Sequence, residues 1–195
     1  MAAGLIMNLE LQSERLLLRP LSESDLDISV EILTDPEVMK YVAETYTRQQ
    51  VAEEMPLATK RGGGGCVGIW CVMDRAAGEK FGTAVLLPIP IEEEDTNWDL
   101  VGGPDLPDRE IEVGYLLKPG AWGKGYATEI TRRLLKFAFE ETPLEQVVAV
   151  TDPHNEASKS VLLKSGLRYE GMRRAYASDC PGYRITRQQW LAENS

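Results

Sequence analysis

The spacing of apolar and polar residues along the chain predicts strands and helices in mixed order. Short apolar segments that end at proline, glycine or charged residues are typical of strands. Such segments span residues 15–19, 67–73, 80–87, 111–117 and 147–150, and two more strands are expected near 168–174 and 183–190. Because helical patterns are interspersed among these strands, the chain is predicted to form a mixed α/β domain.

Helical patterns occur in four places, and three of them have a recognisable start signal. Thr47 and Asn155 are candidate N-caps, and Ser22 with Asp25 has the spacing of a capping box. The strongest pattern covers residues 123–141, where apolar side chains recur at helical spacing: Ala127, Ile130, Leu134 and Ala138. This stripe predicts an amphipathic helix with one buried face.

Composition excludes several classes of protein. The chain has 195 residues, of which 43% are hydrophobic and 27% charged, as is typical of one globular domain. No apolar stretch approaches the ~20 residues of a membrane span, and the N-terminus lacks the basic segment of a signal peptide, so we expect a cytoplasmic protein without membrane contacts. Three cysteines without a C-x-x-C and a single histidine, His154, argue against a disulfide framework and against a metal site.

The net charge of −10 is concentrated in one segment. Residues 91–112 contain nine acidic side chains and one basic side chain, Arg109. A surface of this sign is a poor partner for nucleic acid, which binds basic footprints. Prolines and glycines place most of the segment, about 91–108, in a long loop, and loops of this length are often functional. Two interpretations stay open: a solvated acidic loop, or a field that steers cationic substrates toward a neighbouring site.

A glycine-rich turn, WGKGYA over residues 122–127, joins the strand at 111–117 to the amphipathic helix. The first amides of a helix lack backbone acceptors and carry partial positive charge, and glycine lets a phosphate approach them closely. The turn is therefore predicted to bind a phosphorylated ligand, although a plain tight turn is the simpler alternative. A Walker A loop does not fit, because Lys118 occupies its first glycine position and Gly125 the position of Ser or Thr. A Rossmann fingerprint does not fit either, because its last small residue falls on Thr128.

The segment GYLLKPGAWGKGYATE, residues 114–129, resembles the acetyl-coenzyme A motif Q/R-x-x-G-x-G/A of the GNAT acetyltransferase superfamily. Gly125 and Ala127 match that motif, whereas Trp122 stands where glutamine or arginine is usual. This tryptophan, the motif NEAS that begins at Asn155 and the motif KSGLRYEG shortly after it resemble the RimJ/RimL-type ribosomal-protein N-terminal acetyltransferase branch. The first and last predicted strands also resemble that branch, so the resemblance covers almost the whole chain.

The resemblance implies a GNAT-type fold, in which a mixed, mostly antiparallel central sheet is flanked by helices. It further implies one acetyltransferase domain over residues 1–195, with an acidic insertion at about 91–108, and acetyl-CoA as the cosubstrate. In the family, a strand backbone pairs with the pantothenate arm, turn amides hold the pyrophosphate, and an asparagine contacts the pantetheine arm. The corresponding cofactor-binding positions here are Tyr115, Leu116, Leu117, Gly123, Lys124, Gly125, Tyr126, Ala127, Thr128, Asn155 and Ser158.

The same resemblance implies direct attack of a neutral amine on the thioester, which requires a base. Glu112 is the candidate base, because it lies on the strand that enters the glycine-rich turn and shares a face with Leu116. A glutamate at a sheet edge or in a salt bridge is the simpler alternative. Other GNAT enzymes place a glutamate on the strand before the asparagine, and this chain has Val150 at that position.

A hydroxyl donor is also needed when coenzyme A leaves as a thiolate. Many GNAT enzymes use a tyrosine seven residues after the asparagine, but here that residue is Leu162. Ser158 is therefore the candidate catalytic acid, with Tyr115 or Tyr176 as alternatives, and Glu170 is a further candidate for substrate contact. For Ser158 the simpler alternative is a serine that faces solvent.

A protein N-terminal amine is the favoured acceptor. An α-amine has a pKa of about 7.7–8 and is partly neutral at pH 7, whereas a lysine with a pKa of about 10.4 is almost fully charged. The alternatives are a small polyamine or aminoglycoside, which a wide acidic cavity would favour, and a non-catalytic sensor that binds acyl-CoA. Exposed sheet edges also make a homodimer an expectation.

Overall fold

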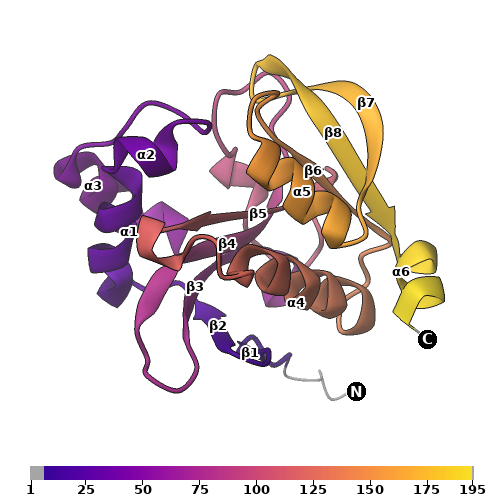
Figure 1. The fold of residues 1–195 in the computed structure, drawn as a ribbon, viewed down its shortest axis with the longest axis horizontal. Coiled ribbons are helices and arrows are strands. Elements are labelled where there is room, and N and C mark those ends of the chain that lie inside the picture. The colour runs from indigo at the N-terminus through magenta and orange to yellow at the C-terminus, as the bar shows by residue number, and fades with distance from the viewer. Residues whose placement is uncertain (1–6, 195) are drawn as a thin grey trace.

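The computed structural model describes residues 7–194 and shows a twisted sheet with helices packed against it (Figure 1). Its strands are β1 (Leu11–Gln12), β2 (Leu16–Pro20), β3 (Gly68–Asp74), β4 (Lys80–Pro88), β5 (Ile111–Leu117), β6 (Gln146–Val150), β7 (Arg168–Ala175) and β8 (Ser178–Thr186). Its helices are α1 (Leu26–Leu33), α2 (Pro36–Met39), α3 (Arg48–Ala58), α4 (Tyr126–Glu140), α5 (Glu156–Lys164) and α6 (Arg187–Asn194).

Within the described residues, eight strands form one sheet in the order β1-β2-β3-β4-β5-β6-β8-β7. Neighbouring strands are antiparallel, except that β5 and β6 run parallel. Helices α4 and α5 lie beside each other against the sheet, and α1, α2 and α3 gather at its other side (Figure 1). A mixed, mostly antiparallel sheet with flanking helices confirms the predicted fold class.

Side chains that alternate along β3 show how the sheet separates two cores. Trp70 and Val72 join the large core that contains α4, and the Trp70 and Phe137 rings meet edge to face with centroids 5.8 Å apart. Cys71 belongs to a second core with residues of α1 and α3, and Ile69 packs against it. Because successive strand residues point to opposite faces, one apolar strand serves both layers.

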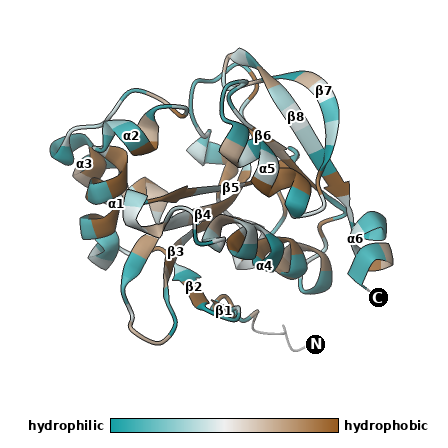
Figure 2. Ribbon diagram, in the orientation of Figure 1, coloured by the Kyte–Doolittle hydropathy of each residue, from teal (hydrophilic) through white to brown (hydrophobic). Residues whose placement is uncertain are grey.

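The amphipathic pattern predicted over residues 123–141 forms α4, and its stripe is confirmed. Ile130, Leu134 and Ala138 are fully buried, and Ala127 packs against the same core from a half-buried position. In Figure 2 the central strands are largely brown, whereas α4 carries both colours, as an amphipathic helix should. This packing fixes the N-terminal end of α4 against the carboxyl end of β5.

Strands β5 and β6 are in register at a single residue pair, Glu112 and Val148. Beyond this pair β5 continues to Leu117 in register with β4 alone, and no other register pair joins β5 to β6 in the described part of the chain. The two strands therefore diverge toward their carboxyl ends, and the sheet opens there.

The acidic loop, residues 91–108, connects β4 to β5 and is anchored at two places. Near its start, the Ile91 carbonyl accepts a hydrogen bond from the Ala177 amide at 3.0 Å, in the turn between β7 and β8. Further on, Val101 is buried in the core, and the Gly103 carbonyl accepts a bond from Gly64 at 3.4 Å. The loop thus lies against the folded body rather than extending away from it.

The predicted strand at 183–190 is wrong in its second half, because α6 begins at Arg187. Thr186 and Gln189 form a reciprocal cap: the Thr186 amide donates to Gln189 Oε1 at 2.9 Å, and the Gln189 amide donates to Thr186 Oγ1 at 3.2 Å. The Arg187 guanidinium also donates to main-chain carbonyls at the end of α4, and Trp190 is buried. The T-x-x-Q spacing is a capping-box signal that the sequence contained.

Candidate active site

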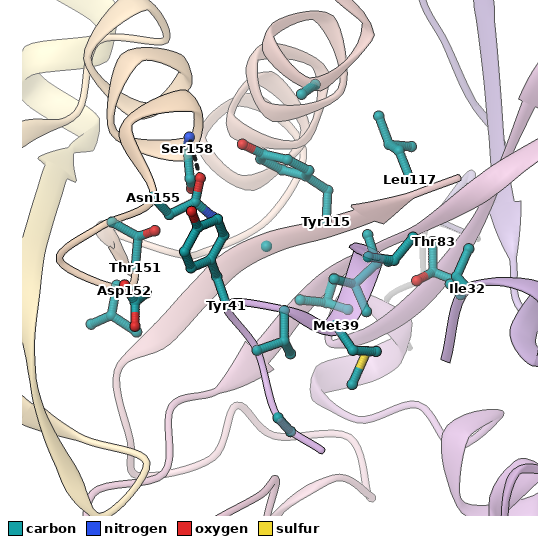
Figure 3. Close-up of a pocket in the computed structure, with 18 of the residues that line it drawn as sticks. Ile32, Met39, Tyr41, Thr83, Tyr115, Leu117, Thr151, Asp152, Asn155 and Ser158 are labelled. Atoms are coloured by element: carbon teal, nitrogen blue, oxygen red, sulfur yellow. Dashed lines mark hydrogen bonds between the residues drawn. The ribbon is translucent and has the colours of Figure 1, made fainter. Parts of the chain in front are cut away.

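A cleft of about 1650 Å³ runs along the opening between β5 and β6. Figure 3 shows Tyr115 on β5 and Asn155 and Ser158 at the start of α5 on one side of the cleft, with Tyr41 reaching into the same space. Of the predicted cofactor-binding residues, all but Lys124 line this cleft, and so does Glu112. The structure therefore gathers residues from three separate motifs around one opening.

The glycine-rich turn forms one end of the cleft. Gly123 and Gly125 have φ of +72° and +79°, a left-handed conformation that glycine adopts without strain. The Glu129 amide is the first helical donor of α4 and bonds the Gly125 carbonyl at 3.1 Å. The preceding amides have no acceptor within the helix and are available to an anionic ligand.

Arg15, just before β2, holds this turn in place, and the sequence analysis did not identify it. Its guanidinium donates to the Lys124 carbonyl at 2.9 Å and to Glu129 Oε2 at 2.8 Å, and it lies 4.6 Å from the centre of the Tyr126 ring. The Arg15 amide donates to the other Glu129 oxygen at 2.8 Å. The signal is not local, because the two partners are 114 residues apart.

The inner edge of β5 forms the floor of the cleft. Tyr115, Leu116 and Leu117 are in register with Ala84, Thr83 and Gly82 of β4. On their other side, the described residues offer no strand partner, because β6 has already diverged. Backbone groups on this side can pair with an extended polar ligand that enters the cleft.

Helix α5 supplies a wall of the cleft. Asn155 Oδ1 accepts a hydrogen bond from the Ser158 amide at 3.0 Å, which is the predicted N-cap. Burial raises the pKa of Tyr115 while the nearby Ser158 side chain lowers it, and the net direction is upward. Two of the candidate acids thus lie near each other in the cleft.

Glu112 lies at the point where β5 and β6 part. Its side chain is 5% exposed, and one of its oxygens, Oε1, accepts a hydrogen bond from the Tyr176 hydroxyl. Burial raises the pKa of Glu112 to about 7, although the bond from Tyr176 acts in the opposite direction. Glu112 is therefore not the salt-bridged glutamate of the simpler alternative, since no cation bonds it among the described residues.

Carboxylates are abundant on the cleft lining. Eight line it, against two lysines, Lys40 and Lys164. The acidic members are Glu37, Glu44, Glu54, Glu94, Asp95, Glu112, Asp152 and Asp179. Burial and the charge of Asp95 in the acidic loop raise the pKa values of Tyr46 and Glu54. The acidic loop thus contributes to the cleft, whereas Glu170, which bonds Arg184 at 2.8 Å, is not among the residues that line it, and its substrate contact stays a prediction.

Comparison with known proteins agrees with this geometry. A family model described as an acetyltransferase (GNAT) domain matches residues 15–168. The chain is 33% identical over 195 residues to the FsC-acetyl coenzyme A-N(2)-transacetylase of Aspergillus fumigatus, covering 93% of this chain and 77% of that protein. The fold and cleft thus belong to an acyltransferase, and the chain is a member of the GNAT acetyltransferase family. The protein is therefore an acetyl-CoA-dependent N-acetyltransferase, which transfers the acetyl group to an amine.

Solved structures show the same fold. An acetyltransferase of the GNAT family from Bacillus anthracis aligns with a TM-score of 0.68 at 24% identity, over 92% of this chain and 99% of that one. The aminoglycoside acetyltransferase AAC(6')-Ib, solved in complex with coenzyme A, aligns with a TM-score of 0.72 at 20% identity, over 92% and 99% of the two chains.

Residues 7–194 contain no helix that is long and apolar enough to cross a membrane. The same residues hold no group of three or more His, Cys, Asp or Glu side chains with the arrangement of a metal site.

Proposed function

We propose that this enzyme transfers the acetyl group of acetyl-CoA directly to a primary amine, and that the acceptor is a protein N-terminal α-amine, as in the RimJ/RimL-type branch. The observation that carries the proposal is Glu112: a buried carboxyl group on the cleft lining with a pKa raised to about 7. Acid–base catalysis is most effective when the catalytic pKa lies near that of its partner and near the working pH.

Three features fit acetyl-CoA as the cosubstrate. The amides before Glu129 suit the pyrophosphate, the inner edge of β5 suits the amide-containing pantetheine arm, and Asn155 adds a side-chain amide at the start of α5. In the described residues, the Asn155 side-chain NH₂ has no protein acceptor, so it remains free to donate to the arm. Lys124 belongs to the turn but does not line the cleft, so only its backbone amide enters the proposal.

The pKa of Glu112 favours an α-amine over lysine. An α-ammonium with a pKa of about 7.7–8 lies about one unit above Glu112, whereas lysine at about 10.4 lies more than three units above it. Each unit corresponds to about 1.4 kcal/mol of unfavourable proton transfer. Proton transfer to Glu112, directly or through one water, therefore costs less free energy from an N-terminal amine than from an ordinary lysine.

The proposed acetyl transfer begins at Glu112, which takes one proton from the ammonium group of the acceptor. The neutral nitrogen then attacks the thioester carbonyl carbon. The carbon–nitrogen bond forms, the carbon–sulfur bond breaks, and the nitrogen releases its second proton. A proton from the Ser158 hydroxyl, which Tyr115 supports, reaches the departing sulfur, and the nitrogen's second proton restores that hydroxyl. The products are the acetamide and coenzyme A with a free thiol.

A small polyamine or aminoglycoside is the second candidate acceptor, and the acidic lining favours it. Glu54 on α3 and Asp95 in the acidic loop lie close enough for the charge of one to raise the pKa of the other's carboxyl. Carboxylates placed in this way lower the free energy of a ligand with several positive charges. In either case the proposal treats 1–195 as one acetyltransferase domain in which the insertion at 91–108 shapes the acceptor side.

The test measures free thiol release from acetyl-CoA with three kinds of amine: peptides with free N-termini, the same peptides blocked at the N-terminus but carrying lysine, and polyamines with aminoglycosides. We expect release with free N-termini and little with blocked peptides. Release with polyamines or aminoglycosides alone would replace the first acceptor with the second. Tight binding of acetyl-CoA without release on any amine would contradict the proposal and favour the sensor.

The proposed acid is tested separately, with Ser158→Ala. Loss of the Ser158 hydroxyl should lower kcat by about 10-fold or more, because the leaving thiolate loses its nearest proton donor. The affinity for coenzyme A should change little, since the Ser158 backbone amide that bonds Asn155 is retained. An unchanged kcat would remove Ser158 from the mechanism.

A further inference from the structure

The turn between β7 and β8 has an unusual backbone. It consists of Tyr176 and Ala177, which have φ of +51° and +52°. Two-residue hairpin turns of this type usually carry Asn-Gly or glycine, because side chains crowd the backbone in this conformation. Strain of this kind persists where surrounding contacts fix it, and it is concentrated at functional sites.

The contacts that fix this turn come from the chain that leads into the acidic loop. The Tyr176 amide donates to the Pro90 carbonyl at 3.2 Å, and the Ala177 amide donates to the Ile91 carbonyl at 3.0 Å. The Arg174 guanidinium bonds Glu92 at 2.9 Å just beside them. The turn is therefore tied to the 90–92 segment by three separate contacts.

The held turn carries the Tyr176 side chain to Glu112. The Tyr176 hydroxyl donates to Oε1 of Glu112, 64 residues away in the chain. The other oxygen, Oε2, has no hydrogen-bond partner among the described residues. It is not among the buried side-chain polar atoms that lack a partner, so part of its surface is accessible. Because Glu112 lines the cleft, Oε2 is the oxygen that a substrate proton can reach.

We propose that Tyr176 is a positioning residue for acetyl transfer: its hydroxyl holds one oxygen of Glu112 so that the other faces the amine. The inference rests on the proposed role of Glu112 as the base. Tyr176 does not itself exchange protons with substrate, because burial and the adjacent Glu112 raise the pKa of its hydroxyl far above the working range. It acts as a fixed donor that also favours the ionised form of Glu112.

The other charged groups near Glu112 are Arg173 on β7 and Asp95 in the acidic loop. Arg173 lowers the pKa of Glu112, but its guanidinium is engaged by Glu110. Asp95 raises the pKa of Glu112. Neither makes a hydrogen bond to Glu112, so Tyr176 is its one direct polar partner among the described residues.

The first test reads the proton on Glu112 directly and needs no acceptor. Carboxyl ¹³C signals of glutamate are titrated by NMR in the full-length protein, and Glu112→Gln identifies the relevant signal. In Tyr176→Phe the midpoint of Glu112 should rise by about one pH unit, because a hydrogen bond to the ionised form is lost. A midpoint that stays at the wild-type value would overturn the proposal.

The second test follows acetyl transfer from acetyl-CoA to a peptide with a free N-terminus across pH 6–9.5. The acidic limb of kcat/KM should move upward in Tyr176→Phe, so that the rate falls about fivefold at pH 7 and by less than twofold at pH 9. A uniform loss at every pH would indicate a merely structural role and would contradict the inference.

Tyr183→Phe is the matched control, because it removes the hydroxyl of another tyrosine whose side chain is largely buried. Tyr183 is 4% exposed on β8 and lies outside the cleft lining. Its pH profile and the Glu112 midpoint should match the wild type. If no amine is acetylated at all, the proposed function fails, whereas the NMR titration still decides whether Tyr176 controls Glu112.

Discussion

Asp25 and Glu112 are both buried carboxylates, with 0% and 5% of their surface exposed, yet their surroundings differ. Asp25 precedes α1 and is bonded by Arg19 at 2.6 Å and by Lys80 at 3.0 Å. Glu112 lies in the middle of the sheet and is bonded by the neutral hydroxyl of Tyr176. One carboxylate is held by two cations, and the other by none.

This difference shifts the pKa values of Asp25 and Glu112 in opposite directions. Burial raises the pKa of Asp25 too, but hydrogen bonds from Arg19, Ser22 and Lys80 outweigh it and hold that pKa well below the ordinary value. For Glu112 burial dominates, and the pKa rises to about 7. The charge of the hydrogen-bonding partner, rather than burial itself, distinguishes a structural carboxylate from one suited to proton transfer.

The largest expected effect is on catalysis. Glu112→Gln keeps the shape and the acceptor for Tyr176 but removes the base, so kcat/KM should fall by about 100-fold or more. Asp25→Asn, assayed on the folded fraction, should stay within about threefold of the wild type because Asp25 does not line the cleft. Equal losses of kcat/KM in the two variants, measured by thiol release, would contradict the assignment of a catalytic role to Glu112 and a structural role to Asp25.

The next effect is on folding stability. Asp25→Asn leaves Arg19 without its buried partner, and the free energy of unfolding in urea should fall by about 3 kcal/mol at pH 7. Because the folded-state pKa of Asp25 is lowered, this contribution is present above its unfolded pKa of 3.8 and is lost as the pH falls. Asp27→Asn is the control: its carboxylate also bonds Lys80 but is exposed, so it should cost at most about 1 kcal/mol.

The third expected effect has the opposite sign. The folded-state pKa of Glu112 is raised from 4.5 to about 7, so ionising it costs stability as the pH rises through that interval. Glu112→Gln should therefore be more stable than the wild type at pH 8, by up to about 3 kcal/mol, and equal to it near pH 4. If Glu112→Gln were less stable than the wild type at pH 8, ionised Glu112 would not lower the stability of the folded protein.

Elements with strong local signals were predictable from the sequence. The strand at 111–117 and the helix at 123–141 follow from apolar periodicity and glycine, and the Asn155 cap follows from helix-start chemistry. These elements also carry all of the predicted cofactor-binding residues. The short helix α2 was missed, although Asp35 followed by Pro36 is an N-cap signal.

Contacts between distant parts of the chain were not predictable. Arg15 meets Glu129 and Tyr176 meets Glu112 only because the sheet order places their elements together. Tyr176 was an alternative candidate for the catalytic acid, but no local sequence pattern indicates that its hydroxyl bonds Glu112, the candidate base. The same holds for the acidic loop, whose charge is visible in the sequence while its contribution to the cleft is not.

The single register pair between β5 and β6 divides the sheet into two blocks, β1–β5 and β6–β8. A single register pair joins the backbones of the two blocks, and α4 packs against strands of both. Regions with few backbone hydrogen bonds open locally at a lower free energy than global unfolding. We therefore expect the entrance of the cleft to widen along this boundary while the strand pairing within each block is retained.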